Sequence, residues 1–140
     1  MERLRSTDGP PPSSLQEIRP LVLIDTTQLA LERSISGAAQ RHEALAANLA
    51  NASTPGYRRV DVDFHGTLAA AMGSGDRATV EHTAFTTQTD PSVGVTQADG
   101  NSIDVDGESA KLAANALEQQ AAVSVLKART AIIRSALGVA

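Results

Sequence analysis

Hydrophobic residues recur at alternating steps of three and four residues along two long stretches of the chain, a pattern that predicts amphipathic helices. The first stretch runs from about residue 26 to 52 and the second from about residue 107 to 137. Because this spacing is that of heptad repeats, we expect the two helices to pair as an antiparallel, coiled-coil-like hairpin. The residues expected at the helix-packing interface are Leu31, Ile35, Leu45 and Leu49 in the first helix and Leu112, Val123, Leu126, Ile133 and Leu137 in the second.

Local signals mark both ends of the first helix. Asp25, followed three positions later by Gln28, resembles a capping box before the apolar repeat. Pro55 disfavours helical geometry at the residue before it, and Gly56 supplies a turn, so the helix must end close to residue 52. Gly37 interrupts the repeat at a cost in helix propensity, but its small size permits the close approach of another helix.

The second helix has the charge distribution that a helix dipole favours. Asp104 or Asp106 can cap its first turn, and the basic residues gather near its carboxyl end. At about 1.5 Å per residue it reaches roughly 45 Å. A helix of this length extends beyond any compact core that the chain could build alone.

The middle of the chain, about residues 53–106, shows weaker patterns. Apolar and acidic residues alternate over residues 60–64, which predicts a short half-buried strand. Residues 68–72 favour one or two helical turns, and the alternation at 79–87 is compatible with an edge strand or a hairpin. We therefore expect a mainly α fold with an irregular middle segment and little β structure.

Residues 1–19 contain consecutive prolines and no periodicity, which indicates a flexible leader before a domain spanning residues 20–140. An apolar stretch of the kind found in a secretory signal is missing from this leader, so we expect no cleavable signal peptide. The apolar run at residues 21–24 is too short to anchor the chain in a membrane.

The composition limits what this fold can bury and bind. Aromatic residues make up 2% of the chain and cysteine is absent, so a bulky core and disulfides are both excluded. A chain with so few large side chains must bury its surface against neighbouring subunits. The formal net charge is −4 and no basic cluster is interleaved with aromatics, which argues against nucleic-acid binding.

The sequence offers little support for catalysis. His42, His65 and His82 are far apart and match no metal-binding spacing. An EF-hand alignment of the acidic residues before the second helix places Ala113 where a bidentate glutamate is required. Nucleophile and phosphate-binding motifs are also missing, so we expect neither an enzyme nor a bound cofactor, metal or small-molecule substrate.

The run from Leu45 to Arg58, LAANLANASTPGYR, resembles the amino-terminal signature of the bacterial flagellar axial proteins, which form the rod, the hook and the hook junction. The residues that carry the resemblance form the expected signature turn: Asn48, Asn51, Thr54, Pro55, Gly56 and Tyr57. They also have a purely local interpretation, because asparagine and threonine satisfy helix-terminal groups and Pro-Gly reverses the chain.

The short length, residues 59–64 and residues 99–108 are similar to those of the proximal rod proteins within this family. Two features depart from the pattern: the leader is longer, and Glu118-Gln119 stands where a Tyr-Gln pair is common. The alternatives are another member of the rod family, or a soluble helical adaptor or export chaperone.

The resemblance implies a structural subunit of the basal body that transmits torque from the motor to the hook and filament. It implies export through the flagellar type III apparatus without cleavage, and assembly into the rod that spans the periplasm. The implied partners are other rod subunits, in homo- and hetero-oligomeric contact, the adaptor protein between membrane ring and rod, and the export gate.

Overall fold

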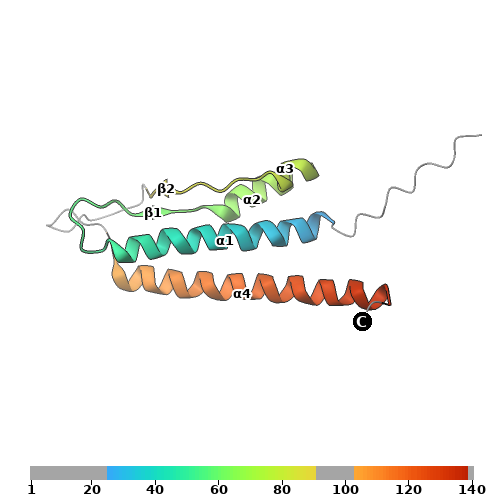
Figure 1. Ribbon diagram of the computed structural model, residues 1–140. Helices are drawn as coiled ribbons and strands as arrows, with labels where there is room; N and C mark the ends of the chain where they lie inside the picture. The colour runs from blue at the N-terminus through green and yellow to red at the C-terminus, as the bar shows by residue number, and fades with distance from the viewer. Residues whose placement is uncertain (1–24, 91–102, 139–140) are drawn as a thin grey trace, which may run out of the picture.

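The computed structural model describes residues 25–90 and 103–138. These residues form α1 (Thr26–Ala50), β1 (Val60–Asp61), α2 (Phe64–Gly73), α3 (Arg77–Glu81), β2 (Gln88–Thr89) and α4 (Val105–Ala136), as Figure 1 shows. The leader expected at residues 1–19 and the apolar run at residues 21–24 lie outside the described residues.

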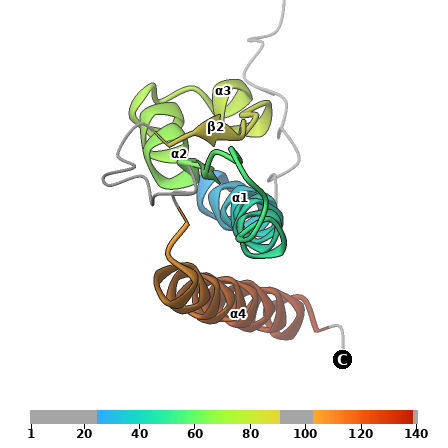
Figure 2. The same ribbon diagram turned by 90° about the vertical axis from the view of Figure 1, so that its left-hand side faces the viewer.

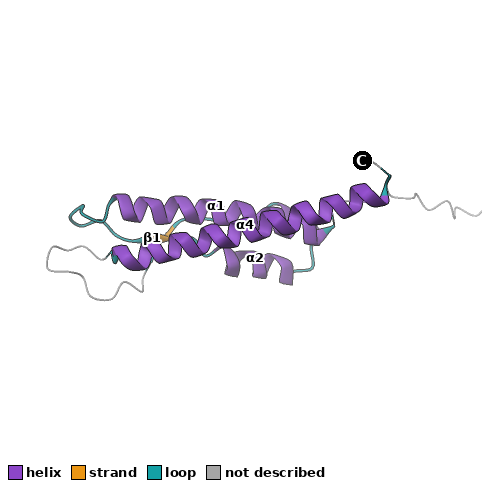
Figure 3. Ribbon diagram, turned by 90° about the horizontal axis from the view of Figure 1, so that it is seen from below, coloured by secondary structure: helices purple, strands orange, loops and turns teal. Residues whose placement is uncertain are grey.

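Helix α1 lies at the centre of the fold, between α4 on one side and the short elements α2, α3, β1 and β2 on the other (Figure 2). Helices α1 and α4 run side by side along most of their length (Figure 3). Asp25, before the start of α1, pairs with Arg129 near the end of α4, which fixes the antiparallel direction. The predicted fold class, mainly α with paired terminal helices, is confirmed.

The helix ends follow local hydrogen-bonding rules, with one exception. Asp25 Oδ1 accepts a hydrogen bond from the Gln28 N–H at 2.8 Å, the cap that the sequence indicates. Asn51 closes α1, and its side-chain Nδ2 donates to the Ala47 carbonyl at 2.8 Å. Asp104 is the N-cap of α4, but its side chain makes no capping hydrogen bond.

The strand expected over residues 60–64 is shorter than its alternation suggests. Only Val60–Asp61 is a strand, and it pairs antiparallel with β2. Phe64 begins α2 instead, because Asp63 Oδ1 accepts a hydrogen bond from the Gly66 N–H at 2.9 Å and caps a helix. Val62 and Phe64 are nevertheless both buried, so the alternation correctly predicts which of these side chains lie in the interior.

The edge strand or hairpin considered for residues 79–87 does not form. Asp76 accepts hydrogen bonds from the Ala78 and Thr79 N–H groups and starts α3 there. The strand that pairs with β1 comes later, at residues 88–89.

The apolar core lies between α1 and the middle segment, on the side of α1 away from α4. One cluster contains Ala38, Ala44, Val62, Phe64 and Phe85, and a smaller one contains Leu29, Ala71 and Val80. The rings of Phe64 and Phe85 meet edge to face with their centroids 6.2 Å apart. Gly37 makes this packing possible, because a Cβ at that position would lie 2.6 Å from the Phe64 Cβ.

Candidate functional site

Helices α1 and α4 meet along a seam, and most of the residues expected at the helix-packing interface are at least half-buried. Leu45 is fully buried. The half-buried members are Leu31, Ile35, Leu49, Leu112, Val123, Leu126 and Ile133. Leu137 is the exception: it follows the last helical residue and stays 58% exposed. Asp25, at the start of α1, lies opposite Arg129. Leu137 comes eight residues after Arg129, so it lies beyond the end of α1 and has no part of that helix to pack against.

Two buried polar residues of α4 were missed by the sequence interpretation. Among the described residues, Glu108 and Asn115 are the only fully buried side chains that α4 contributes. Asn115 Nδ2 donates to the Ala38 carbonyl at 2.8 Å, whereas its Oδ1 has no hydrogen-bond partner within the described chain. Their spacing of seven residues, in phase with Leu112, is the signal that could have placed them on the seam.

Asn48 connects three segments that are far apart in the sequence. Its Nδ2 donates to the Val60 carbonyl at 2.7 Å and to Glu108 Oε2 at 2.8 Å. Its Oδ1 accepts hydrogen bonds from the Val60 N–H at 2.9 Å and from the Tyr57 hydroxyl at 3.5 Å. The side chain is fully buried, so this signature residue joins α1, β1 and the start of α4.

An ionic cluster around Arg59 lies beside Asn48. The Arg59 side chain is 6% exposed; its Nε donates to Glu108 Oε1 at 2.6 Å and its Nη2 donates to Asp61 Oδ2 at 2.9 Å. Its Nη1 donates to Asp90. These contacts tie the start of α4 to residues in or next to β1 and β2. A guanidinium with its fixed fork of donors suits such a site.

Two further cations complete the cluster and affect its titration. Lys111 Nζ lies 3.1 Å from Glu108 Oε1, and Arg41 Nε lies 2.9 Å from Asp61 Oδ1. Burial by itself would raise the pKa of Glu108, but hydrogen bonds from Arg59, Asn48 and Lys111 outweigh it and hold the pKa below its ordinary value of 4.5. Burial would also raise the pKa of Asp61, but hydrogen bonds from Arg41 and Arg59 outweigh it, so this pKa is lowered as well.

The lowered pKa of Glu108 predicts loss of stability in acid. A carboxyl with a lowered folded-state pKa stabilises the fold fully above its unfolded value, here 4.5, and this stabilisation is lost as the pH falls through the folded value. We expect the fold to weaken below about pH 4.5 and Glu108→Gln to weaken less over the same range. The measurement is helix content by circular dichroism against pH at fixed osmolyte concentration.

The control for this titration is Asp106→Asn, an exposed carboxyl in the same first turn of α4. It should keep the acid sensitivity of the parent chain. Equal acid sensitivity in the parent and in Glu108→Gln would show that this carboxyl does not stabilise the fold.

The rest of the signature forms an exposed turn after α1. The Thr54 N–H donates to the Asn51 carbonyl at 2.9 Å, and the Tyr57 N–H donates to the Thr54 carbonyl at 3.2 Å. Gly56 has a φ of 74°, in the left-handed region that favours glycine. Thr54, Pro55 and Gly56 are all exposed. The signature thus combines a buried anchor, Asn48, with a fixed and accessible turn.

The face of α4 opposite the seam carries a second apolar stripe, which we call the outer stripe. Its members are all exposed: Ala110, Ala114, Leu117, Ala121, Val125, Ala128 and Ile132. Steps of three and four residues keep them on one face of the helix. Leu117 and Ile132 are each 69% exposed and Val125 is 49% exposed. Large apolar side chains aligned in this way indicate a surface for protein contact.

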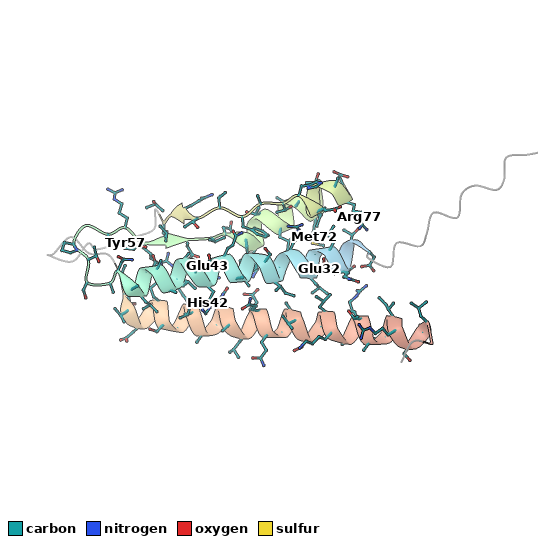
Figure 4. All side chains as sticks on the ribbon, in the orientation of Figure 1. Glu32, His42, Glu43, Tyr57, Met72 and Arg77 are labelled. Atoms are coloured by element: carbon teal, nitrogen blue, oxygen red, sulfur yellow. The ribbon has the colours of Figure 1, made fainter. Side chains whose placement is uncertain are left out.

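The histidines do not form a site together. His42 is exposed on α1 (Figure 4), His65 contacts Glu118 and stacks on Phe64, and His82 follows α3. Within residues 25–90 and 103–138 no group of histidine and acidic side chains could hold a metal ion. None of the described helices is both long and apolar enough to span a membrane.

Comparison with known proteins points to one family. The family model described as flagella basal body rod protein matches residues 34–58, which include the signature. The flagellar basal body rod protein FlgB of Escherichia coli (strain K12) is 36% identical over 123 residues, covering 74% of this chain and 89% of the relative. FlgB of Salmonella typhimurium is 32% identical over the same coverage. FlgB of Cereibacter sphaeroides is 32% identical over 105 residues, covering 69% of this chain and 82% of the relative.

Proposed function

The chain belongs to the family of the flagellar basal body rod protein FlgB, a structural component of the rod, and we propose that it is a subunit of the proximal rod that transmits torque toward the hook and filament. In this proposal the chain has no catalytic role. It passes through the type III apparatus unfolded and uncleaved, and then assembles in the rod that spans the periplasm. Its partners are copies of itself, other rod subunits, the adaptor between membrane ring and rod, and the export gate.

One observation supports an assembly role above all: α4 is poorly buried. Of its 32 residues, the only fully buried side chains are Glu108 and Asn115, both polar. The apolar contacts of its seam are half-buried and its outer stripe is exposed. Burial of apolar surface is the main stabilising term for a packed helix, so a helix that buries so little gains more from neighbouring subunits.

The proposal assigns a role to each part of the chain. Residues 20–140 are the rod domain, and residues 1–19 are a leader outside it. The helix-packing residues hold α4 on α1, and the signature turn is an assembly contact. The exposure of Thr54, Pro55 and Gly56 supports this role, because the interior packing does not require these side chains.

The test is fractionation of basal bodies. A strain lacking its own copy of the gene receives the tagged chain, and intact basal bodies are purified and probed for the tag. The proposal expects recovery of motility and stoichiometric tag in the rod fraction. A stable cytosolic complex without tag in basal bodies would indicate an adaptor or an export chaperone instead.

Folding coupled to assembly predicts a dilute chain with less helix than the structure contains. The physical reason is the small apolar area that α4 buries in one subunit. Circular dichroism of the purified chain should show far less helix than expected from α1 to α4, and the helical signal should rise with protein concentration. A strongly helical chain that melts cooperatively at every concentration would contradict the coupling.

A charge placed in the seam should prevent assembly. Leu126 and Ile133 are half-buried on the side of α4 that faces α1, so Leu126→Asp or Ile133→Asp would desolvate a carboxylate against apolar side chains. We expect loss of swimming in soft agar and of the chain from basal bodies. Leu126→Met, which keeps an apolar side chain of similar volume, should swim normally. Normal motility of the aspartate variants would show that these two positions are not part of the helix-packing interface.

A further inference from the structure

We propose that the outer stripe of α4 docks on the exposed flank of α1 in a second copy of this chain. This flank, which we call the α1 flank, consists of the exposed residues Glu32, Ser36, Glu43 and Ala46 and the half-buried Ala39. The inference rests on the proposed rod function and specifies which surfaces meet. It makes the contact heterologous: each copy uses α4 toward one neighbour and α1 toward another.

The outer stripe has the geometry of a helix-packing face. Leu117, Val125 and Ile132 project from it, with alanines between them. Large side chains that alternate with small ones interdigitate with a facing helix. From Leu117 to Ile132 the stripe is about 22 Å long, at 1.5 Å per residue.

The charges beside the stripe determine what it can face. Lys127 and Arg134 are exposed, and neither forms an ion pair within the described residues. From Gln119 to Ala136, α4 contains no acidic residue. Two α4 helices packed on each other through this half would bring basic residues together, so pairing about a twofold axis is disfavoured. An acidic surface is therefore the complementary one.

The α1 flank meets this requirement. Glu32 and Glu43, both labelled in Figure 4, are exposed and lie eleven residues apart, which places them on one face of the helix. Neither forms an ion pair within the described part of the chain. Ser36, Ala39 and Ala46 are small, so large side chains of α4 can approach the α1 backbone closely between the two carboxylates.

The two surfaces match in length as well as in charge. Residues 32–46 extend about 21 Å along α1, close to the roughly 22 Å between Leu117 and Ile132 on the outer stripe. The outer stripe and the α1 flank do not contact each other within one chain, because α1 and α4 meet through the seam instead. Both surfaces are therefore free to contact another copy. A copy docked on the α1 flank therefore leaves its own α1 flank free for the next copy, and the contact propagates instead of closing as a dimer.

Cysteine cross-linking tests this arrangement directly, because the chain has no cysteine of its own. Val125→Cys is made on the outer stripe, and Ser36→Cys and Ala46→Cys are made on the α1 flank. Each is produced alone and together with a partner variant in a flagellated strain, and purified basal bodies are treated with a short bismaleimide. Thr86→Cys, exposed on the middle segment, is the control.

The proposal expects dimers when Val125→Cys is combined with Ser36→Cys or Ala46→Cys, and no dimer from any variant alone or from the control. A dimer of Val125→Cys with itself would establish twofold pairing and overturn the inference. Cross-linking only to a different rod protein would also overturn it. Absence of the parent chain from basal bodies would instead reject the proposed function, so the two failures are distinguishable.

Charge reversal provides a second readout. Lys127→Glu/Arg134→Glu and Glu32→Lys/Glu43→Lys should each lower the yield of the Val125–Ala46 cross-link by about two- to thirtyfold, the effect of losing two surface ion pairs. Cross-linking between one copy with the first pair of changes and one copy with the second should restore the yield. If the reversed copies cross-link as well as the parent, or if the combination restores nothing, the charges do not select the partner surface.

Discussion

Replacing Asn48 by aspartate is expected to be the most damaging isosteric change in this protein. The Nδ2 group donates hydrogen bonds to the Val60 carbonyl and to Glu108 Oε2. A carboxylate oxygen in its place would donate nothing and would face a second buried carboxylate. Such a change costs about 3 to 5 kcal/mol. We expect the chain to require much more osmolyte to become helical, and the strain to be non-motile.

The matched control is Asn51→Asp, the same change within the same signature. Asn51 is only half-buried, and its Nδ2 donates to the Ala47 carbonyl alone. The loss of one such hydrogen bond costs about 1 kcal/mol. The two variants are compared by trimethylamine oxide titration of helix content, which follows folding of marginal chains, and by motility. Equal effects of the two changes would contradict the central position assigned to Asn48.

Gly37→Ala is expected to have the second-largest effect on stability. It should destabilise the fold, although helix propensity alone predicts that it would stabilise it. Alanine in place of glycine within a helix stabilises it by about 1 kcal/mol. At Gly37, however, the added Cβ would lie 2.6 Å from Phe64 Cβ and 2.7 Å from its Cγ. Phe64 is fully buried and starts α2, so it cannot move without opening the core. We expect a net loss of about 1 to 3 kcal/mol.

Gly73→Ala is the control for this substitution. Gly73 is the last residue of α2, and a Cβ there would meet nothing within 4 Å. The change should leave the osmolyte midpoint unchanged or shift it toward greater stability. If Gly37→Ala behaved like Gly73→Ala, the close contact between α1 and Phe64 would not be a feature of the folded protein.

What the sequence predicts well in this chain is local. The Asp25 cap and the two amphipathic helices depend on residues within a few positions of each other, and the structure contains them. The three-residue and four-residue steps also predict that the two helices pair, and the contact between Asp25 and Arg129 shows that they do so antiparallel. The alternation at residues 60–64 reports that Val62 and Phe64 are buried, although a capping aspartate converts the last of these positions into the start of a helix.

What the sequence does not predict depends on contacts between distant segments. Glu108 and Asn115 are buried because Asn48 and the Ala38 carbonyl, 60 and 77 positions away, meet their polar atoms. Their spacing in phase with Leu112 can place them on the seam, but a repeat that counts hydrophobic side chains only does not identify the polar groups to which they bond. The small core between α1 and the middle segment is hidden for the same reason: Phe85 and Val80 lie in a stretch without clear periodicity, and their burial follows from the packing of α2 and α3 on α1.

The buried polar contacts of the seam also bear on how the hairpin resists mechanical load. Glu108 and Asn115 bond to α1 at points about 10 Å apart along α4. Sliding α4 by one turn would leave both side chains buried opposite groups that cannot bond to them, whereas half-buried leucines would exchange partners at little cost. The two helices therefore oppose shear along their common axis more strongly than an entirely apolar seam of the same length.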